Sequence, residues 1–326
     1  MKKKIKVALI YKKSYHYFQP DHFDRTSYDF FFKALKRNER LEIFYYPCLE
    51  NFDVSKIKGG CDIILLPSDF PDGSPKIIGN RDLGIPIISR TGDPHHVKRH
   101  KRIEFIKENK IDCLFSNHPD SYICKYYPKK IKHKTIIYGL EPELYQNVPT
   151  FKTRIKDRVL ITGAMGRTDL RNRVANYILN PGRSGWYHYK LRTLCKELDY
   201  VEYHGMKGKK YVNEDYPTYT SKYRAIIAAT TFYPTLKYWE NSAAGCLTFM
   251  EITEKNDGYF LGYKDNETSI FINEKNYQTK LEEFISDPDN PKWEEIAGAG
   301  REYTMNNLTN DHATDELVKL MDELIK

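Results

Sequence analysis

The sequence has few cysteines, and none of them forms a closely spaced pair. Six occur among 326 residues, without the C-x-x-C spacing of zinc and dithiol sites. They are Cys48, Cys61, Cys113, Cys124, Cys195 and Cys246. Several stand in apolar, strand-like surroundings. The pattern predicts buried free thiols in a reducing compartment and argues against a disulfide framework or a zinc site.

Long apolar runs are also missing. No apolar stretch approaches the roughly 20 residues that a membrane-spanning helix needs. The N-terminus, MKKKIKVALIY, is basic and then apolar, but its apolar part is too short for the core of a signal peptide and predicts a first strand. Internal repeats and low-complexity segments are absent too. We therefore expect a cytoplasmic protein, with a peripheral contact to an anionic membrane left open.

What is present is an ordinary globular composition with a basic excess. Hydrophobic residues make up 40% and charged residues 29%, and 326 residues suit two domains of roughly 150 each. The net charge of +8 favours an anionic partner, such as a nucleotide diphosphate, an anionic membrane surface or nucleic acid. The 26 tyrosines include side chains that can stack on sugars and bases.

Short apolar runs alternate with longer amphipathic segments, which is the pattern of an α/β protein. Runs such as Ile63–Leu65 are continuous, as expected for parallel strands buried on both faces. In the first half, strands are predicted at Ile5–Tyr11, Leu41–Tyr46, Asp62–Pro67, Ile85–Arg90, Cys113–Ser116 and Thr135–Ile137. Helices are predicted between them at Thr26–Asn38, Pro75–Leu83, Val97–Asn109 and Pro119–Tyr127.

A second series of strands and helices follows a stretch with proline and charge. Strands are predicted at Arg158–Gly163, Tyr200–His204, Thr230–Tyr233 and Leu247–Met250. Helices are predicted at Leu170–Leu179, Tyr187–Leu198, Tyr219–Ala228, Lys237–Ala244, Tyr277–Ser286, Pro291–Asn306 and Ala313–Ile325. We therefore predict two Rossmann-like parallel-sheet domains facing a cleft, at residues 1–145 and 158–310. A linker at 146–157 joins them, and a last helix occupies 311–326. In such sheets ligands bind beyond the carboxyl ends of the strands, so the cleft is the expected site.

The segment Lys237–Leu247 reads KYWENSAAGCL and carries the strongest chemical signal. Lys237 and Glu240 stand three apart at the start of a predicted helix and share one of its faces. A carboxylate there can accept both hydroxyls of a ribose, and a lysine one turn away can meet phosphate. The other interpretation is an exposed ion pair on a helix that packs through Ala243 and Ala244.

This segment resembles the donor-site motif of GT-B glycosyltransferases, particularly of their group-1 and CgeB-like branches. Further similar segments follow in the family's order between Tyr138 and the C-terminus, and more weakly between Ile85 and Asn117. They are Gly139–Tyr145, Arg158–Gly163, Tyr203–Gly205, Phe260–Phe271 and Gly298–Arg301. Their order and spacing carry the resemblance.

The resemblance implies a GT-B fold and a glycosyltransferase that uses a nucleotide-diphosphate sugar, with a UDP-sugar as the expected donor. Glu240 would hold the ribose and Lys237 the diphosphate, with Asn241 beside them. His204 and Gly205 would line the base. Residues 158–310 would then bind the nucleotide-sugar and residues 1–145 the acceptor, and the last helix would return toward the first domain.

One position departs from the resemblance. Group-1 enzymes usually carry a second glutamate eight positions before the ribose glutamate, where this chain has Phe232. Those enzymes use that acid at the distal hydroxyls of the sugar, so sugar recognition must differ here. The departure favours the CgeB-like branch and leaves the stereochemistry of transfer open.

A glycine-rich turn, Gly163–Arg167, follows a predicted strand, and Arg171 and Arg173 come soon after it. Backbone N–H groups of such a turn can approach phosphate, and arginine contacts diphosphate oxygens in pairs. By resemblance, Arg167 joins Lys237 in neutralising the leaving diphosphate. Arg173 is a further candidate, and Arg171 is interpreted as surface charge. No Asp-x-Asp motif stands in a suitable loop, so we expect no metal and no cofactor beyond the donor.

In the first half, Asp93, His95 and His96 follow the predicted strand Ile85–Arg90. An aspartate and histidines at a strand end suit general-base work on an acceptor hydroxyl. Asp93 is the first candidate, and His95 or His96 is the second. The alternatives are a cap for the next helix and a basic surface cluster.

We therefore predict a metal-independent, hexosyltransferase-like enzyme. Its acceptor class stays open among saccharide, lipid-linked, protein and nucleic-acid hydroxyls. The alternative is a non-catalytic binding protein for nucleic acid or an anionic polymer, whose affinity would fall steeply with salt.

Overall fold

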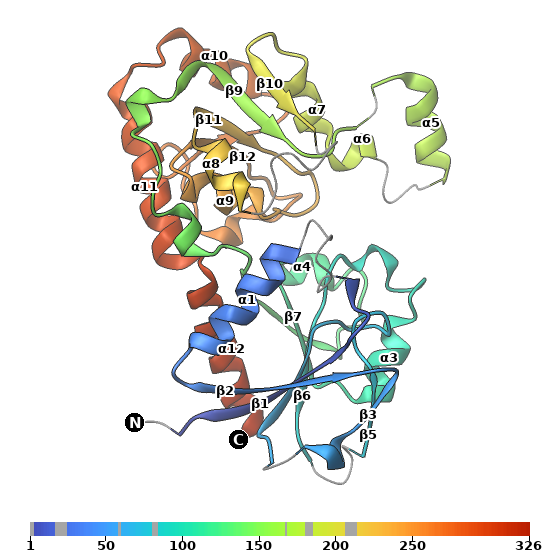
Figure 1. The fold of residues 1–326 in the computed structure, drawn as a ribbon. Coiled ribbons are helices and arrows are strands. Elements are labelled where there is room, and N and C mark those ends of the chain that lie inside the picture. The colour runs from blue at the N-terminus through green and yellow to red at the C-terminus, as the bar shows by residue number, and fades with distance from the viewer. Residues whose placement is uncertain are drawn as a thin grey trace. The chain divides into compact units, whose positions relative to one another are not determined.

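The computed structural model divides the chain into two compact units, shown in Figure 1. The first comprises Met1–Gly139 and Thr309–Lys326, and the second comprises Leu140–Leu308. The structure describes residues 3–16, 25–57, 60–79, 84–166, 168–179, 185–205 and 214–326, with the backbone alone at 25–28 and 30. Each unit is described by itself.

A six-stranded parallel sheet forms the centre of the first unit. Its order is β2-β1-β4-β6-β7-β8. The strands are β1 Ile5–Lys12, β2 Leu41–Cys48, β4 Ile63–Leu66, β6 Ile87–Arg90, β7 Cys113–Ser116 and β8 Lys132–Thr135. The four central strands β1, β4, β6 and β7 are almost wholly buried because both faces of the sheet are covered.

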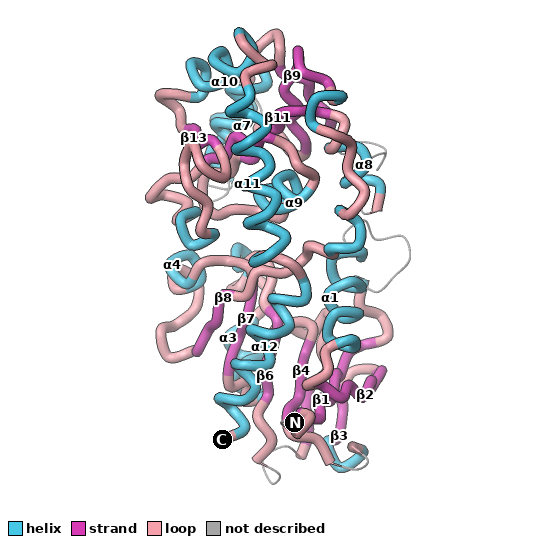
Figure 2. The backbone as a smooth tube through the Cα atoms, turned by 90° about the vertical axis from the view of Figure 1, so that its left-hand side faces the viewer, coloured by secondary structure: helices cyan, strands magenta, loops and turns pink. Residues whose placement is uncertain are grey.

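Helices α1 (Arg25–Arg37) and α12 (Asn310–Ile325) lie side by side on one face of this sheet (Figure 2). Their apolar faces, which include Leu35 and Leu317, join the core of the strands. The opposite face is covered by a small two-stranded sheet of β3 (Asn51–Asp53) and β5 (Lys76–Ile78), and by α3 (Arg102–Asn109) and α4 (Asp120–Ile123).

The second unit has a five-stranded parallel sheet with the order β10-β9-β11-β12-β13. The strands are β9 Ile155–Thr162, β10 Val201–His204, β11 Tyr223–Ala228, β12 Leu247–Glu251 and β13 Ile270–Ile272. The helices are α5 Leu170–Leu179, α6 Gly185–His188, α7 Lys190–Lys196, α8 Asp215–Thr220, α9 Lys237–Ala243, α10 Tyr277–Ser286 and α11 Pro291–Asn307. Helices α7, α10 and α11 bury apolar side chains against this sheet.

In each sheet, the strand that comes first in the sequence lies between the strands that come second and third. The strand order therefore reverses at one point in each sheet. It lies between β1 and β4 in the first unit, and between β9 and β11 in the second. Ligands of open parallel sheets bind at the carboxyl ends of the strands beside such a point. The topology therefore predicts ligand sites beside the residues that follow β9 and β11, and beside those that follow β1 and β4.

The predicted α/β class with two parallel sheets is confirmed. Three element predictions were wrong. Residues 219–228, expected as a helix, contain strand β11, because a short buried apolar run suits either element. Within the predicted helix Pro75–Leu83, residues Lys76–Ile78 form strand β5, and residues 80–83 lie outside the described residues. Residues 230–233 form no strand. Residues 146–157, expected as a linker, lie in the second unit, where Phe151 is buried.

Among the described residues, no helix combines the length and the hydropathy that crossing a lipid bilayer requires.

Candidate functional site

Gly163 directly follows strand β9 at the reversal point of the second sheet. Its φ of +98° belongs to the region that glycine tolerates and other residues avoid. A Cβ on this residue would lie 3.0 Å from Lys237 Cε and 3.2 Å from Arg192 Nη1. Two cationic side chains therefore approach the backbone of this turn, and a side chain at position 163 would displace them.

Lys237 and Glu240 lie in the first turn of α9 and share Tyr216 as a neighbour. Lys237 Nζ is 3.4 Å from the Tyr216 hydroxyl and 4.6 Å from the centre of its ring. Burial, followed by the negative charge of Glu240, raises the pKa of both Tyr216 and Tyr145. Glu240 and Lys237 are only partly buried, so both charges can meet a ligand at this edge.

Two arginines hold the C-terminal end of α9. The Arg154 guanidinium donates hydrogen bonds to the carbonyl oxygens of Ala244 and Gly245, at 3.0 and 2.7 Å. Arg301 donates from Nε to the carbonyl oxygen of Ala243 at 3.1 Å. Cations are favourable where a helix exposes its last carbonyl groups. These bonds orient α9, and with it the side chains of its first turn.

The remaining donor-site candidates, His204, Gly205 and Asn241, differ in burial and in hydrogen-bond partners. His204 ends β10, accepts the backbone N–H of Gly163 at 3.3 Å through its carbonyl, and contacts Glu202 Oε1 through Nε2 at 2.7 Å. Gly205 follows it and is exposed. Asn241 is fully buried, and its Oδ1 accepts the Tyr216 hydroxyl at 2.9 Å. Asn241 therefore supports the site through Tyr216.

The structure tests only one of the two arginines predicted after Gly163. Arg167 lies outside the described residues. Arg173 lies on α5, with its guanidinium 3.8 Å from the centre of the Trp186 ring. Among the described residues, the side chains that a Cβ on Gly163 would meet belong to Lys237 and Arg192 instead.

The sequence analysis missed Arg192, Tyr216 and Glu251 at this edge of the sheet. Arg192 lies in α7 and is 3% exposed, and burial lowers its pKa. Glu251 is the last residue of β12, directly after the predicted strand Leu247–Met250. The rule that ligands bind at strand ends could have identified Glu251. Arg192 and Tyr216 lie inside helices and carry no comparable signal.

Asp93 and His95 adjoin each other in the first unit, after strand β6. Asp93 Oδ1 accepts the backbone N–H of His95 at 3.1 Å and lies 3.5 Å from His95 Nε2. The Tyr122 hydroxyl is 3.0 Å from His95 Nε2, and the Tyr126 hydroxyl is 3.0 Å from Nδ1. His95 is thus enclosed by partners, whereas the Asp93 side chain is 35% exposed.

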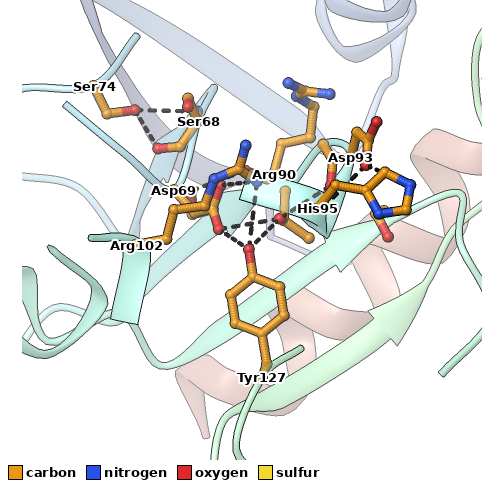
Figure 3. Close-up of polar contacts among 12 residues, drawn as sticks. Ser68, Asp69, Ser74, Arg90, Asp93, His95, Arg102 and Tyr127 are labelled. Atoms are coloured by element: carbon orange, nitrogen blue, oxygen red, sulfur yellow. Dashed lines mark hydrogen bonds and ion pairs between the residues drawn. The ribbon is translucent and has the colours of Figure 1, made fainter. Parts of the chain in front are cut away.

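A buried polar network supports this turn (Figure 3). Asp69 Oδ2 accepts hydrogen bonds from the Tyr127 hydroxyl at 2.5 Å and from the Thr91 hydroxyl at 3.0 Å. Arg102 Nη1 lies 3.4 Å from Asp69 Oδ1, and Arg90 Nε donates to the carbonyl oxygen of Pro67 at 2.9 Å. The network fixes the chain between β6 and Asp93.

The other histidines of this unit differ from His95. The His96 ring lies 5.5 Å from the ring of His100. Burial lowers the pKa of His118 to about 3, against the opposing charge of Asp93, so this imidazole is neutral at physiological pH. Within the described ranges, no three His, Cys, Asp or Glu side chains come together in an arrangement that could hold a metal ion.

No protein-family model matches the sequence, and no curated protein matches it. Solved structures do match the fold at low sequence identity. Sucrose-phosphate synthase from Thermosynechococcus elongatus aligns with a TM-score of 0.58 at 13% identity, over 98% of this chain and 99% of that chain. A glycosyltransferase from Rickettsia africae ESF-5 aligns with a TM-score of 0.56 at 12% identity, over 99% of both chains.

Anabaena HepE in complex with UDP-glucose aligns with a TM-score of 0.55 at 8% identity, over 98% of this chain and 100% of that chain. The chain has the GT-B fold. The fold expected from the donor-site motif is therefore confirmed, and membership of the CgeB-like branch stays a prediction.

Proposed function

We propose that this protein is a glycosyltransferase that moves a sugar from a nucleotide-diphosphate donor to a hydroxyl acceptor. The observation that carries the proposal is the placement of Lys237 and Glu240 in the first turn of α9 beside Tyr216, with the Lys237 side chain approaching Gly163. An acid and a cation one helical turn apart suit the ribose and the diphosphate of one ligand. Structures with this fold include HepE in complex with UDP-glucose, which supports a UDP-sugar as the donor.

Electrostatic stabilisation of the leaving diphosphate would supply most of the catalysis. Lys237 and the buried Arg192 bring two positive charges to the Gly163 turn, and the outer phosphate can be neutralised there as the bond to the sugar breaks. With these cations in place, the proposed departure proceeds without a metal ion. Arg167 keeps its proposed role as a third cation.

For the acceptor we propose Asp93 as the general base, because it is more exposed than His95 and is held by a hydrogen bond to the backbone. His95 would orient Asp93, since both of its ring nitrogens already lie near tyrosine hydroxyls. Asp93→Asn should lower kcat at least about a hundredfold, as expected for loss of a general base, while leaving donor affinity unchanged. Unchanged turnover would exclude this role.

The donor site is tested by titrating the protein with UDP and UDP-glucose. Lys237→Ala and Glu240→Ala should each weaken binding by about ten- to a hundredfold, because each removes a charged hydrogen-bonding partner. Lys264 and Glu267 are the matched control, an exposed pair with the same spacing in the same unit. Alanine at either control position should leave affinity unchanged. If no nucleotide or nucleotide-sugar stabilises the wild-type protein, the proposal is wrong.

We also propose that the protein works in the cytoplasm, in peripheral contact with an anionic membrane. Helix α5 supports the membrane contact, because none of its residues is buried. Its strongly exposed apolar residues are Leu170, Val174, Ile178 and Leu179. Arg171 and Arg173 lie on the same helix, and such a basic, apolar helix suits an anionic lipid surface.

Sedimentation with phosphatidylserine vesicles tests the contact. Val174→Asp with Ile178→Asp should abolish co-sedimentation, and Leu49→Asp, at an exposed leucine of the other unit, should not. Equal sedimentation of all three proteins would exclude α5 as the contact.

A further inference from the structure

Within the part of the chain that the structure describes, three buried polar atoms at the carboxyl edge of the second sheet have no hydrogen-bond partner. They are Arg192 Nε, Thr231 Oγ1 and Glu251 Oε2. The three residues are 3%, 4% and 5% exposed. Buried polar atoms in proteins are nearly always paired, so three unpaired atoms on one edge call for an explanation.

Arg192 approaches this edge from α7, and Thr231 and Glu251 lie beyond or at the ends of neighbouring strands. Arg192 Nη1 donates to the carbonyl oxygen of Ala164 at 3.1 Å, directly after the Gly163 turn. Thr231 follows β11, which lies between β9 and β12 in the sheet. Glu251 ends β12, one residue beyond the pair Ala228 and Met250. The set thus continues from the proposed diphosphate site along the strand ends.

The backbone around these side chains is firmly held. The Tyr238 hydroxyl donates to the carbonyl oxygen of Glu251 at 3.1 Å, and Asn256 Nδ2 donates to the same oxygen at 2.5 Å. Asn256 Nδ2 also donates to the carbonyl oxygen of Thr230 at 3.0 Å, which ties the ends of β11 and β12 together. A fixed backbone with unpaired side-chain ends is what a preorganised binding site requires.

The charges of this set are only partly balanced. Burial raises the pKa of Glu251 to about 7, opposed by the positive charge of Arg192 and aided by Glu274. Arg192 and Glu251 influence each other's pKa, yet Arg192 Nε and Glu251 Oε2 make no hydrogen bond. Unpaired buried groups lower the stability of the ligand-free protein. A ligand with hydroxyl groups would form hydrogen bonds with them and so stabilise the bound protein.

We propose that Arg192, Thr231 and Glu251 form the subsite for the sugar of the donor and select a neutral, hydroxyl-rich sugar. The proposal rests on the proposed function and adds the substrate class to it. The set contains a donor, an acceptor and a hydroxyl that can be either, which matches sugar hydroxyls that both donate and accept. Glu251 supplies from β12 the carboxylate that the sequence lacks at Phe232. The carboxylate of a uronic acid would be repelled by Glu251.

Calorimetric titration at pH 8 with UDP, UDP-glucose, UDP-N-acetylglucosamine and UDP-glucuronate tests the subsite in the full chain. In the wild-type protein, a neutral UDP-sugar should bind about tenfold or more tightly than UDP, and UDP-glucuronate should bind no more tightly than UDP. Glu251→Gln and Thr231→Val should each keep the UDP affinity within about twofold and lose most of the advantage of the sugar.

Two further measurements separate a sugar contact from a structural role. The ligand-free Glu251→Gln protein should melt at or above the wild-type temperature at pH 8, because the change removes a buried negative charge. Thr231→Val should do the same, because it removes an unpaired buried hydroxyl. Glu274→Gln is the matched control, a neighbouring but half-exposed acid, and should leave all affinities unchanged. If the Glu251→Gln protein fails to fold, Thr231→Val still tests the sugar subsite.

The outcomes are distinguishable. A wild-type protein that binds neither UDP nor any UDP-sugar would overturn the proposed function itself. A protein that binds UDP but gains no affinity from any sugar would overturn only the subsite. The subsite would also be overturned if the Glu251→Gln and Thr231→Val proteins still bound a neutral UDP-sugar more tightly than UDP by the wild-type factor. A wild-type preference for UDP-glucuronate would overturn it as well.

Discussion

Glu251 is an acid at a position where burial opposes its ionisation. Its pKa is raised from 4.5 to about 7, so between these values the folded protein holds a proton that the unfolded chain has lost. Whenever the folded state binds more protons, stability decreases as the pH rises. The contribution of Glu251 is therefore most favourable below about pH 4.5, falls through this window and is constant above about 7.

We expect Glu251→Gln to remove this dependence. The variant should gain stability over the wild-type protein as the pH rises from about 4.5 to about 7, by at most about 3 kcal/mol. Urea unfolding of both proteins across this pH range measures the difference. The Arg192 guanidinium and the Lys255 ammonium group, which favour the ionised form, are present in both proteins. A difference that does not change with pH would contradict the raised pKa.

At the residue scale, the sequence predicted charged site residues that are close together along the chain. It did not predict those that only the folded structure brings to one edge of the sheet. Lys237 and Glu240 were found because three residues place them on one face of a short helix. Arg192 and Glu251 lie 59 positions apart (251 minus 192), and only the sheet brings their elements to one edge. Arg173 was expected at the diphosphate from proximity in sequence, yet it stacks on Trp186.

Helix α9 has seven residues and depends on tertiary contacts for its orientation, because so short a helix has little stability of its own. Arg301 on α11 contributes one of these contacts, a hydrogen bond from Nε to the carbonyl oxygen of Ala243 at 3.1 Å, which ties α9 to a longer helix. The same side chain donates to the carbonyl oxygen of Tyr145 at 2.6 Å.

Arg301→Ala should lower the free energy of unfolding by about 1–3 kcal/mol, because it leaves two carbonyl groups without a charged donor. It should also weaken UDP binding, since Lys237 and Glu240 move with α9. Urea unfolding and UDP titration measure the two effects. Arg158→Ala, at an exposed arginine that also donates to a backbone carbonyl, should change stability by no more than about 0.5 kcal/mol. Equal effects of both substitutions would contradict a special role for Arg301.

At the element scale, the sequence predicts best those elements whose period is unambiguous. Helices α5 and α10 occupy the predicted residues, because their patterns extend over ten residues. Strand β11 was mistaken for a helix, since Ala225–Ala228 is apolar throughout and shows no period. Strand β13 was missed because its three residues are too few to form a pattern.

At the scale of the whole molecule, the chain ends in a helix that belongs to its first unit. Leu317 and Met321 of α12 are fully buried in the core of the six-stranded sheet. Arg37 and Arg40 pair with Asp311 and Asp322 of the same helix. The apolar period of α12 predicts a helix but does not indicate which sheet the helix covers. Only the family resemblance indicated that it returns to the first domain.

Removing residues 309–326 should therefore unfold the first unit and spare the second. Loss of α12 exposes the face of the sheet beside α1, and Leu317→Ala alone should cost about 2–5 kcal/mol. Hydrogen exchange should show fast exchange throughout β1, β4 and β6 and continued protection of β9, β11 and β12 in the shortened chain. Lys319→Ala, on the exposed side of the same helix, should leave both units protected. If β1, β4 and β6 stay protected without α12, the helix is an accessory to the first unit and not a part of its core.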